Sequence, residues 1–455
     1  MRTKVIIFIC IIFSVASCLK TPDKNQIILP DNNAVFNTNT QNIAVKNPVT
    51  IIFSNGQTIV NNPFERYGVM VSVDGQNVTV SSTVSEIETE INYVLSGITT
   101  AGSVKIYSDY RFGLVLNGVS IQNPTGAAIN IQSGKRISVT LVDYTSNRLI
   151  DERIFRMTEG ERMNGTLYSE GQLIFNGAGS LLIYGNHGHA ICVRDYIRIN
   201  SGNITINNAT SNGIQCRDYF EMNGGNIIIN AKLGGVECTN GYILINDGII
   251  KVNNSGWKGL KSAENLAIHG GKIEVESLND HGISANGNIV ITGGEIYCSS
   301  GKNGTVSNEG SIVITGGLFV LSATKSVFEY AKSFSITGGT ALGVGNASIV
   351  PITSECRQQT VVWDASKFMS GQLISFKSSD NSEVLTFKFP KAYSGSMTLI
   401  YTSPLLQTNT NYAIYKGGSV SGGSDFHGLY SGAVSSGGTV VATFTTSSMV
   451  TAAEM

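Results

Sequence analysis

The sequence is poor in charged residues and in proline. Only 14% of its 455 residues are Asp, Glu, Lys or Arg, whereas an average soluble domain has roughly 25%. The 31 basic residues are balanced by 32 acidic ones, so the chain has no basic field to hold phosphates and we expect no nucleic-acid partner. The eight prolines are too few for collagen or for a proline-rich disordered linker.

Long hydrophobic runs are also scarce, and the one near the start is too short for a membrane span. It covers residues 5–15, against the roughly 20 residues that a spanning helix needs. It ends in Val15-Ala16-Ser17-Cys18, which has the pattern of a bacterial lipobox. We therefore predict that residues 1–17 are a lipoprotein signal peptide and that Cys18 becomes a diacylated N-terminus. An ordinary secretion signal is the alternative.

The lipobox predicts an exported bacterial lipoprotein of the cell envelope, in the outer membrane or at the cell surface. Its membrane partner would be reached through the lipid on Cys18. Residues 18–48 are polar and rich in Asn and Thr, and we expect them to be a tether. Apart from Cys10 in the signal peptide and the lipidated Cys18, five cysteines remain. This number is odd, and their spacing fits neither a zinc site nor a disulfide scaffold. They are Cys192, Cys216, Cys238, Cys298 and Cys356.

A repeat of 22 or 23 residues dominates the middle of the chain. Its marker is a glycine in the second place of a turn that is usually Gly-Gly. The marker glycines are Gly202, Gly225, Gly248, Gly271, Gly294, Gly317 and Gly339. Apolar residues alternate with outward ones on both sides of each turn, as in Ile243/Ile245 before and Ile250/Val252 after it. This alternation is typical of strands, and the period suits one coil of a three-stranded parallel β-helix.

We therefore predict an all-β chain built around a parallel β-helix. Residues 49–165 would hold the N-terminal strands and irregular entry coils, and residues 166–349 the regular helix. The period is lost after Gly339. Residues 350–450 read as short strands with Ser/Gly turns, and we expect a small C-terminal β cap because the end of a solenoid must be covered.

Equivalent residues on successive coils should stack about 4.8 Å apart, the spacing between strands. On this basis Asn200, Asn223 and Asn246 form a polar ladder in the turns. Cys216 and Cys238 share an inward position, where we expect free thiols packed as small core residues. A disulfide between them is the alternative.

The order of motifs resembles a clostridial carbohydrate-binding β-helix family over about residues 50–450. The resemblance rests on short segments in the entry coils and in the tail: residues 91–97, 114–121, 126–129, 390–394 and 411–418. It implies a right-handed, polysaccharide-lyase-like β-helix. It also implies binding of plant cell-wall polysaccharide, including cellulose and acidic pectic glycan, and calcium in the scaffold.

The chain departs from that family where calcium is concerned. The family commonly has Asp before the Gly-Ile of a coil. Here those places hold Asn212, Gly234, Lys258 and His281. Asp195, Asp218 and Asp280 are the weak metal candidates, and Ca²⁺ takes six to eight oxygen ligands, which leaves calcium as an open expectation.

Aromatic residues supply the first candidates for carbohydrate binding. Trp257 lies in a loop of variable length, and such loops usually carry function in a solenoid. Its indole is either a platform for a sugar ring or a lid folded over the coil. Tyr196, Tyr219 and Tyr242 recur every 23 residues and should stack. The stack either stabilises the coils or lines a glycan track.

Charged residues complete the predicted carbohydrate-binding set. Arg194, Arg217, Lys258 and Lys261 have the cationic groups that bind uronate carboxylates. Glu237 lies beside them in register. Because each cation has an acidic neighbour, local charge pairing is the competing interpretation.

The leading hypothesis is a cell-envelope lipoprotein whose β-helix binds polysaccharide. A calcium-dependent lyase acting by β-elimination is an alternative, because a base and carboxylate ligands are what that chemistry needs. The possible bases would be Arg194, Arg217 or Lys261, and the possible ligands Glu237, Asp280 or Asp218. No dense acidic cluster appears on one face, so we assign no catalytic residue. A structural or adhesive surface protein without a glycan site is the third hypothesis.

Overall fold

The protein is described by a computed structural model. The described residues are 47–84, 90–346, 356–364, 366, 368–393 and 396–453. They belong to one compact unit, Ile43–Met455, and they are all-β apart from one 3-10 turn, Glu65–Tyr67. No helix among them is long and apolar enough to span a membrane. The predicted signal peptide, Cys18 and most of the tether lie outside the described residues.

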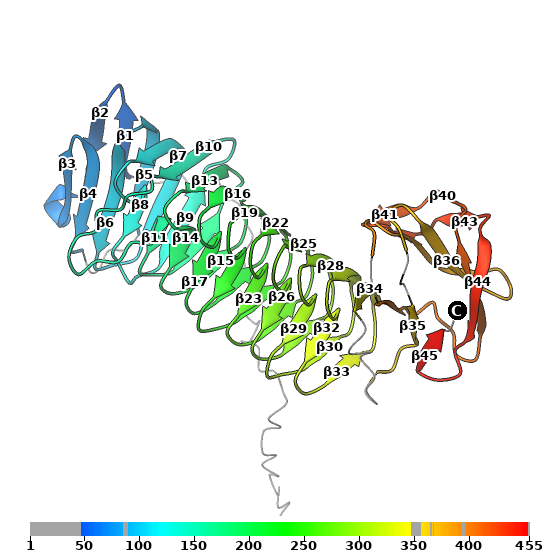
Figure 1. The fold of residues 1–455 in the computed structure, drawn as a ribbon. Helices are drawn as coiled ribbons and strands as arrows, with labels where there is room; N and C mark the ends of the chain where they lie inside the picture. Colours follow the sequence, from blue (N-terminus) through cyan, green and yellow to red (C-terminus); the bar gives the residue numbers. More distant parts are fainter. Residues whose placement is uncertain are drawn as a thin grey trace, which may run out of the picture. The chain divides into compact units, whose positions relative to one another are not determined.

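The predicted parallel β-helix is confirmed, with about eleven turns and three strands in each regular coil (Figure 1). We number the three faces in the order in which a coil visits them. Face 1 is a 12-stranded sheet. It consists of β3 (Val69–Asp74), β4 (Gln76–Ser82), β6 (Gly102–Ser108), β8 (Ile129–Ile131), β11 (Gly165–Ser169), β14 (His189–Val193), β17 (Ile214–Cys216), β20 (Val236–Cys238), β23 (Leu260–Ser262), β26 (Ile283–Ala285), β29 (Thr305–Ser307) and β32 (Phe328–Tyr330).

Faces 2 and 3 flank the repeated glycine turn. Face 2 contains β9 (Ile137–Leu141), β12 (Leu173–Asn176), β15 (Ile197–Ile199), β18 (Phe220–Met222), β21 (Ile243–Ile245), β24 (Leu266–Ile268), β27 (Ile289–Ile291), β30 (Ile312–Ile314) and β33 (Phe334–Ile336). Face 3 contains β10 (Ser146–Asp151), β13 (Ser180–Gly185), β16 (Asn203–Ala209), β19 (Asn226–Asn230), β22 (Ile249–Ser255), β25 (Lys272–Ser277), β28 (Glu295–Ser300), β31 (Leu318–Ala323) and β34 (Thr340–Asn346). Above them, β5 (Ile91–Thr99) and β7 (Phe112–Asn123) run through both faces and join them into one sheet.

The first coils are covered by two antiparallel hairpins. β1 (Val49–Ser54) pairs with β2 (Gln57–Asn61), and β1 also continues the helix by pairing in parallel with β5. On face 1, β3 pairs antiparallel with β4. The parallel stack therefore begins against antiparallel strands, and β2 and β3 become the edge strands at this end.

Inward residues form one continuous core along the coils. In the regular coils the alternating apolar pairs predicted on both sides of each turn are buried, as with Ile243, Ile245, Ile250 and Val252. Cys216 and Cys238 face each other in register with their sulfur atoms 2.9 Å apart. Both are buried and form no disulfide, so the expectation of packed thiols at this position is confirmed.

The asparagine ladder in the turns is also confirmed. The Asn223 side-chain amide donates to Oδ1 of Asn200 at 3.0 Å, and that of Asn246 donates to Oδ1 of Asn223 at 2.7 Å. Asn176 extends the ladder by one coil, since it accepts from Asn200 at 3.0 Å. Each rung connects equivalent turns, so the ladder holds the coils in register.

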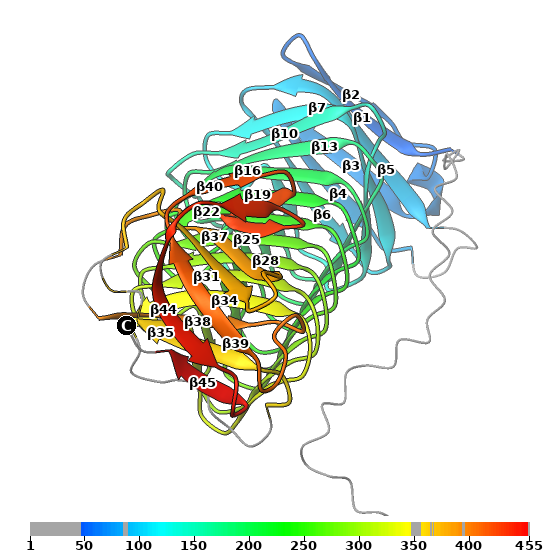
Figure 2. The same cartoon turned by 90° about the vertical axis from the view of Figure 1, so that its right-hand side faces the viewer.

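The C-terminal part closes the helix on face 3. The last strand, β34, pairs antiparallel with β38 (Met397–Thr402), which also pairs with β35 (Thr360–Asp364). Figure 2 shows these strands side by side. β45 (Val450–Ala453) adds to β35.

A six-stranded antiparallel sheet follows from these closing strands. Its order is β41 (Ser424–Phe426), β42 (Leu429–Ser431), β37 (Glu383–Lys388), β36 (Leu373–Ser378), β39 (Asn411–Lys416) and β44 (Thr439–Thr445). A separate hairpin pairs β40 (Ser419–Ser421) with β43 (Val434–Ser436). This part has its own aromatic core around the buried Trp363 and Phe376. It is therefore larger than the small β cap that the sequence predicts.

The marker glycines are required by backbone geometry, which leads to a first prediction. Gly225 has φ +83°, and a Cβ built there would lie 2.8 Å from the carbonyl oxygen of Gly202 in the preceding coil. We expect Gly225→Ala to lower stability by at least ~1 kcal/mol, since an L-residue in the left-handed region costs that much before the clash is counted. The measurement is the urea unfolding midpoint.

Gly134→Ala is the matched control for that substitution. Gly134 has no left-handed φ, and a Cβ there meets nothing within 4 Å. Its midpoint should stay close to that of the unmodified protein. Equal midpoints for the two variants would contradict the role assigned to the marker glycines.

Candidate functional site

Trp257 lies at the corner where the chain passes from face 3 to face 1. It stands after β22 and shortly before β23, and its side chain is 43% exposed. The backbone of this corner is fixed, because the Trp257 N–H donates to the Leu233 carbonyl at 3.0 Å and its carbonyl accepts from the Ser255 hydroxyl at 3.1 Å. The Lys261 ammonium lies 5.5 Å from the indole centroid, within the range of a cation–π contact. The corner therefore presents a held, exposed indole beside a cation.

A chain of polar contacts runs from this lysine across three further coils. Lys261 Nζ lies 2.5 Å from Glu237 Oε1, and Glu237 Oε2 accepts from the Asn212 amide at 2.5 Å. The Asn212 backbone N–H donates to Nδ1 of His189 at 3.2 Å. The Glu237, Asn212 and His189 side chains are buried, so this carboxylate is fully committed and fixes the position of the Lys261 ammonium.

The same His-Asn-Glu arrangement occurs a second time further along the helix. His281 Nδ1 accepts from the Asn303 backbone N–H at 3.3 Å, and the Asn303 amide donates to the Glu329 carboxylate. Between the two copies, Gly234 and Lys258 occupy the place that His and Asn hold in the other coils. The two copies therefore flank Gly234 and Lys258 at this corner, and we call their six residues the polar seam: His189, Asn212, Glu237, His281, Asn303 and Glu329.

Lys258 lies between the two copies and has no salt bridge within the described part of the chain. Burial and the neighbouring Lys261 lower the pKa of Lys258. Its acidic neighbour Asp280 is occupied, with one oxygen 3.0 Å from Lys302 Nζ and 3.5 Å from His281 Nε2. We call the following set the polar edge: Trp257, Lys258, Lys261, Glu237, Asp280 and Lys302.

The predicted tyrosine stack is present at the opposite border of face 1. Neighbouring ring centroids of Tyr196, Tyr219 and Tyr242 lie 4.3 and 5.0 Å apart, with planes 8° and 4° from parallel. Arg198 lies 5.8 Å from the Tyr196 ring and pairs with Glu221 at 2.8 Å. Half-burial raises the pKa of Tyr242 to about 12, so the Tyr242 hydroxyl stays neutral.

The remaining cationic candidates lie on the tyrosine side of face 1. Arg217 contacts Asp218 at 3.7 Å, and both side chains are about half exposed, so the pair contributes little to stability. Arg194 occupies the equivalent place one coil earlier. The predicted binding residues therefore border both sides of face 1, and Glu237 and Lys261 stand on its strands between them.

The three metal candidates are not brought together. Asp195 and Asp218 are neighbours after face 1, where burial and the charge of Asp195 raise the pKa of Asp218. Asp280 lies at the other border of that face, neutralised by Lys302. No group of three or more His, Cys, Asp or Glu side chains suited to a metal occurs among the described residues. These three aspartates do not form a calcium ligand set.

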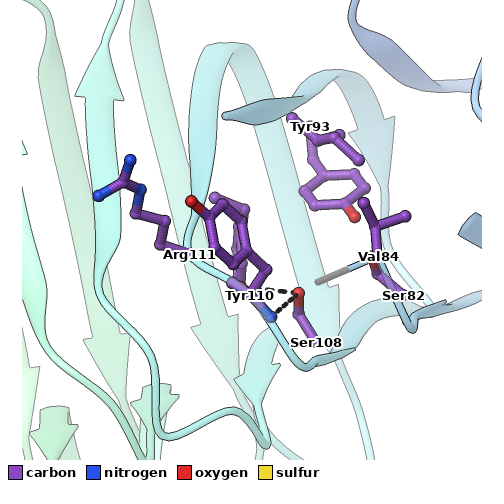
Figure 3. Close-up of a pocket in the computed structure, with 8 residues that line it drawn as sticks. Ser82, Val84, Tyr93, Ser108, Tyr110 and Arg111 are labelled. Atoms are coloured by element: carbon purple, nitrogen blue, oxygen red, sulfur yellow. Dashed lines mark hydrogen bonds between the residues drawn. The ribbon is translucent and has the colours of Figure 1, made fainter. Parts of the chain in front are cut away.

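A narrow crevice in the entry coils is not a ligand site (Figure 3). It is too narrow for a water molecule. The Ser108 hydroxyl donates to the Tyr110 carbonyl at 2.8 Å, and burial raises the pKa of Tyr93 to about 12. Arg111 pairs with Glu90 at 3.0 Å. These groups are structural.

A family model described as "Carbohydrate-binding domain-containing protein" matches residues 74–263 and 247–359. A curated relative with the same description, from Acetivibrio thermocellus, is 30% identical over 131 residues, which are 27% of this chain and 46% of the relative. The chain thus matches less than half of that relative's length.

A solved structure is also similar. It is titled as the polysaccharide lyase-like protein from C. thermocellum, in a gadolinium derivative. The TM-score is 0.40 at 20% identity, and the match covers 64% of this chain and 97% of the other.

The buried histidine of the polar seam gives a prediction for pH dependence. Burial lowers the pKa of His189 to about 4, whereas an unfolded histidine titrates near 6.5. The unfolded state therefore binds more protons between pH 6.5 and 4, and this residue's contribution to stability is lost as pH falls through that window. His189→Asn introduces the side chain that the next coil has at this position. We expect this variant to show a smaller fall in the urea unfolding midpoint as the pH decreases.

The midpoints of the unmodified protein and of His189→Asn are measured over the same pH range. Their difference isolates this residue from the other titrating groups. It should be constant above pH 7 and should change between pH 6.5 and 4. A difference that stays constant over the whole range would show that His189 is not held neutral by burial.

Proposed function

This chain belongs to the family of carbohydrate-binding domain-containing proteins, and from that premise we propose that it binds plant cell-wall polysaccharide at the polar edge. Cellulose and acidic pectic glycan are the two candidate ligands, and the charges favour the acidic one. A uronate polymer offers one carboxylate on each sugar ring. The polar edge offers ammonium groups next to an exposed indole.

The observation that carries the proposal is Lys258 beside Trp257. Lys258 is half-buried, lacks a salt bridge among the described residues and has its pKa lowered by burial and by Lys261. A bound carboxylate would compensate its charge. The 43% exposed indole of Trp257 would stack on the apolar face of the same sugar ring.

The rest of the edge supports this assignment by being already positioned. Glu237 holds Lys261 and is itself held by Asn212, so the cation is ordered before a ligand arrives. Lys302 continues the row in the coil after next. Ordered cations lose little freedom on binding, which favours affinity.

Two substitutions test the site. We expect Trp257→Ala and Lys258→Gln each to weaken binding of polygalacturonate about tenfold or more, the loss typical of a charge-assisted contact or a stacking platform. Lys258→Gln should leave binding of unmodified cellulose unchanged. Affinity electrophoresis gives the ranking and isothermal titration calorimetry the constants.

Tyr144→Ala is the matched control, because Tyr144 is a fully exposed aromatic residue in an earlier coil. It should bind like the unmodified protein. Unchanged polygalacturonate binding in both Trp257→Ala and Lys258→Gln would remove the polar edge as the site. Ultraviolet absorbance of unsaturated sugars in the same samples would point to the lyase alternative, and absence of binding to every glycan to the structural one.

We also propose that the chain is a lipoprotein of the outer membrane or cell surface, anchored through Cys18. The support is the lipobox at residues 15–18. Cys18→Ala should abolish incorporation of labelled fatty acid and move the protein out of the membrane fraction of a bacterial host. Retention of the label in this variant would contradict the anchor.

A further inference from the structure

A pocket of about 690 Å³ lies between face 3 and the C-terminal sheet, away from the polar edge. Its solenoid wall is the start of β25, with Lys272 and Glu274. The opposite wall comes from the end of β37, with Lys388, and from the β41–β42 turn, with Asp425 and His427. We call it the cap pocket. Its volume is in the range of small-molecule and saccharide sites.

The β41–β42 turn is fastened to the solenoid by His427. The imidazole stacks on Tyr297 with centroids 3.6 Å apart and planes 6° from parallel, and its Nε2 lies 3.3 Å from Glu274 Oε1. His427 has φ +50°, a conformation that costs free energy in a residue other than glycine. The pocket is therefore built by specific contacts between its two walls.

The charges on the solenoid wall are already matched. Glu274 lies 3.1 Å from Lys272 Nζ and 3.2 Å from Lys251 Nζ, in addition to His427. Together these partners offset the cost of burial, and the pKa of Glu274 is lowered. Two lysines therefore share this one carboxylate, and of the two only Lys272 lines the pocket.

The cap wall adds separated donors and acceptors. Lys388 is exposed and has no salt bridge within the described residues. Asp425 is exposed, and its carboxylate accepts from the Gly428 backbone N–H at 2.7 Å and from the Tyr430 hydroxyl. Ser370 contributes a hydroxyl to the rim, and Phe426 lies 5.9 Å from the Lys272 ammonium.

We propose that the cap pocket is a second carbohydrate site, which takes the end of an acidic oligosaccharide. Lys388 and Lys272 would bind the sugar carboxylate, while Asp425 and Ser370 would bind hydroxyl groups. A purely apolar ligand does not fit a lining with two ammonium groups and two carboxylates. The inference takes its ligand class from the proposed function, but it rests on different residues.

The pocket and the polar edge lie at opposite ends of the face 3 strands. Lys272 is the first residue of β25, and Trp257 comes after the end of the neighbouring strand β22. The seven residues of the extended strand β22 separate the two places, roughly 23 Å at ~3.3 Å per residue. A long glycan lying along face 3 would reach both sites and gain avidity over a short one.

Calorimetry with trigalacturonic acid on the full chain tests the second site. We expect two sites in the unmodified protein and one site in Lys388→Gln, a substitution of an exposed residue that leaves the fold intact. Trp257→Ala should also retain one site, and the double variant none. Lys135→Gln, at an exposed lysine of the entry coils, is the matched control and should keep two sites.

The two proposals fail in distinguishable ways. A Lys388→Gln titration identical to that of the unmodified protein overturns the cap pocket, whatever Trp257→Ala does. A Trp257→Ala titration identical to that of the unmodified protein overturns the polar edge, while loss of a site in Lys388→Gln still supports the cap pocket. One site in the unmodified protein that Lys388→Gln leaves unchanged also overturns the second site.

Discussion

Parallel hydrogen bonding between equivalent strands is the constraint on which the whole structure depends. A coil of 22 or 23 residues must return the chain to the same place, one strand spacing further along, or the inward residues lose their partners. Gly225 and its equivalents satisfy this constraint at the corner between faces 2 and 3, where a left-handed residue turns the chain. The asparagine ladder and the tyrosine stack impose the same register outside the core, since each joins residues that are one coil apart. The number of residues in a coil can vary only at a corner where no such ladder connects neighbouring coils.

The polar edge lies at a corner where the coil length can vary. At the end of face 3, just before this corner, the pairing of β22 with β25 shifts register between Val252 and Ser255. The shift allows Trp257 to project, while its backbone still bonds to Leu233 of the previous coil. An exposed indole is thus compatible with a rigid scaffold, because only the side chain leaves the stack.

Much of the fold could be predicted from the sequence, because in a solenoid the residues that contact each other in neighbouring coils recur at a fixed spacing along the chain. The inward pairs, the marker glycines, the tyrosine stack and the asparagine ladder all connect residues at that period. The His-Asn-Glu contacts escaped prediction, since Asn212 and Glu237 are 25 residues apart and occupy different places in their coils. In the sequence, the places of Asn212, Lys258 and His281 stand out only as departures from the aspartate that the family resemblance predicts. The cap pocket left no signal either, because His427 and Glu274 are 153 residues apart and one of them lies outside the repeat.

The antiparallel pairing of β38 with β34 has a consequence for self-assembly. An uncovered parallel edge at the end of a β-helix would accept the first coil of another molecule in the same direction, and repeated addition would produce a filament. On face 3 the final strand instead meets a neighbour running the opposite way, so a further coil has no parallel template there. Strand polarity therefore blocks polymer growth along the helix axis on this face.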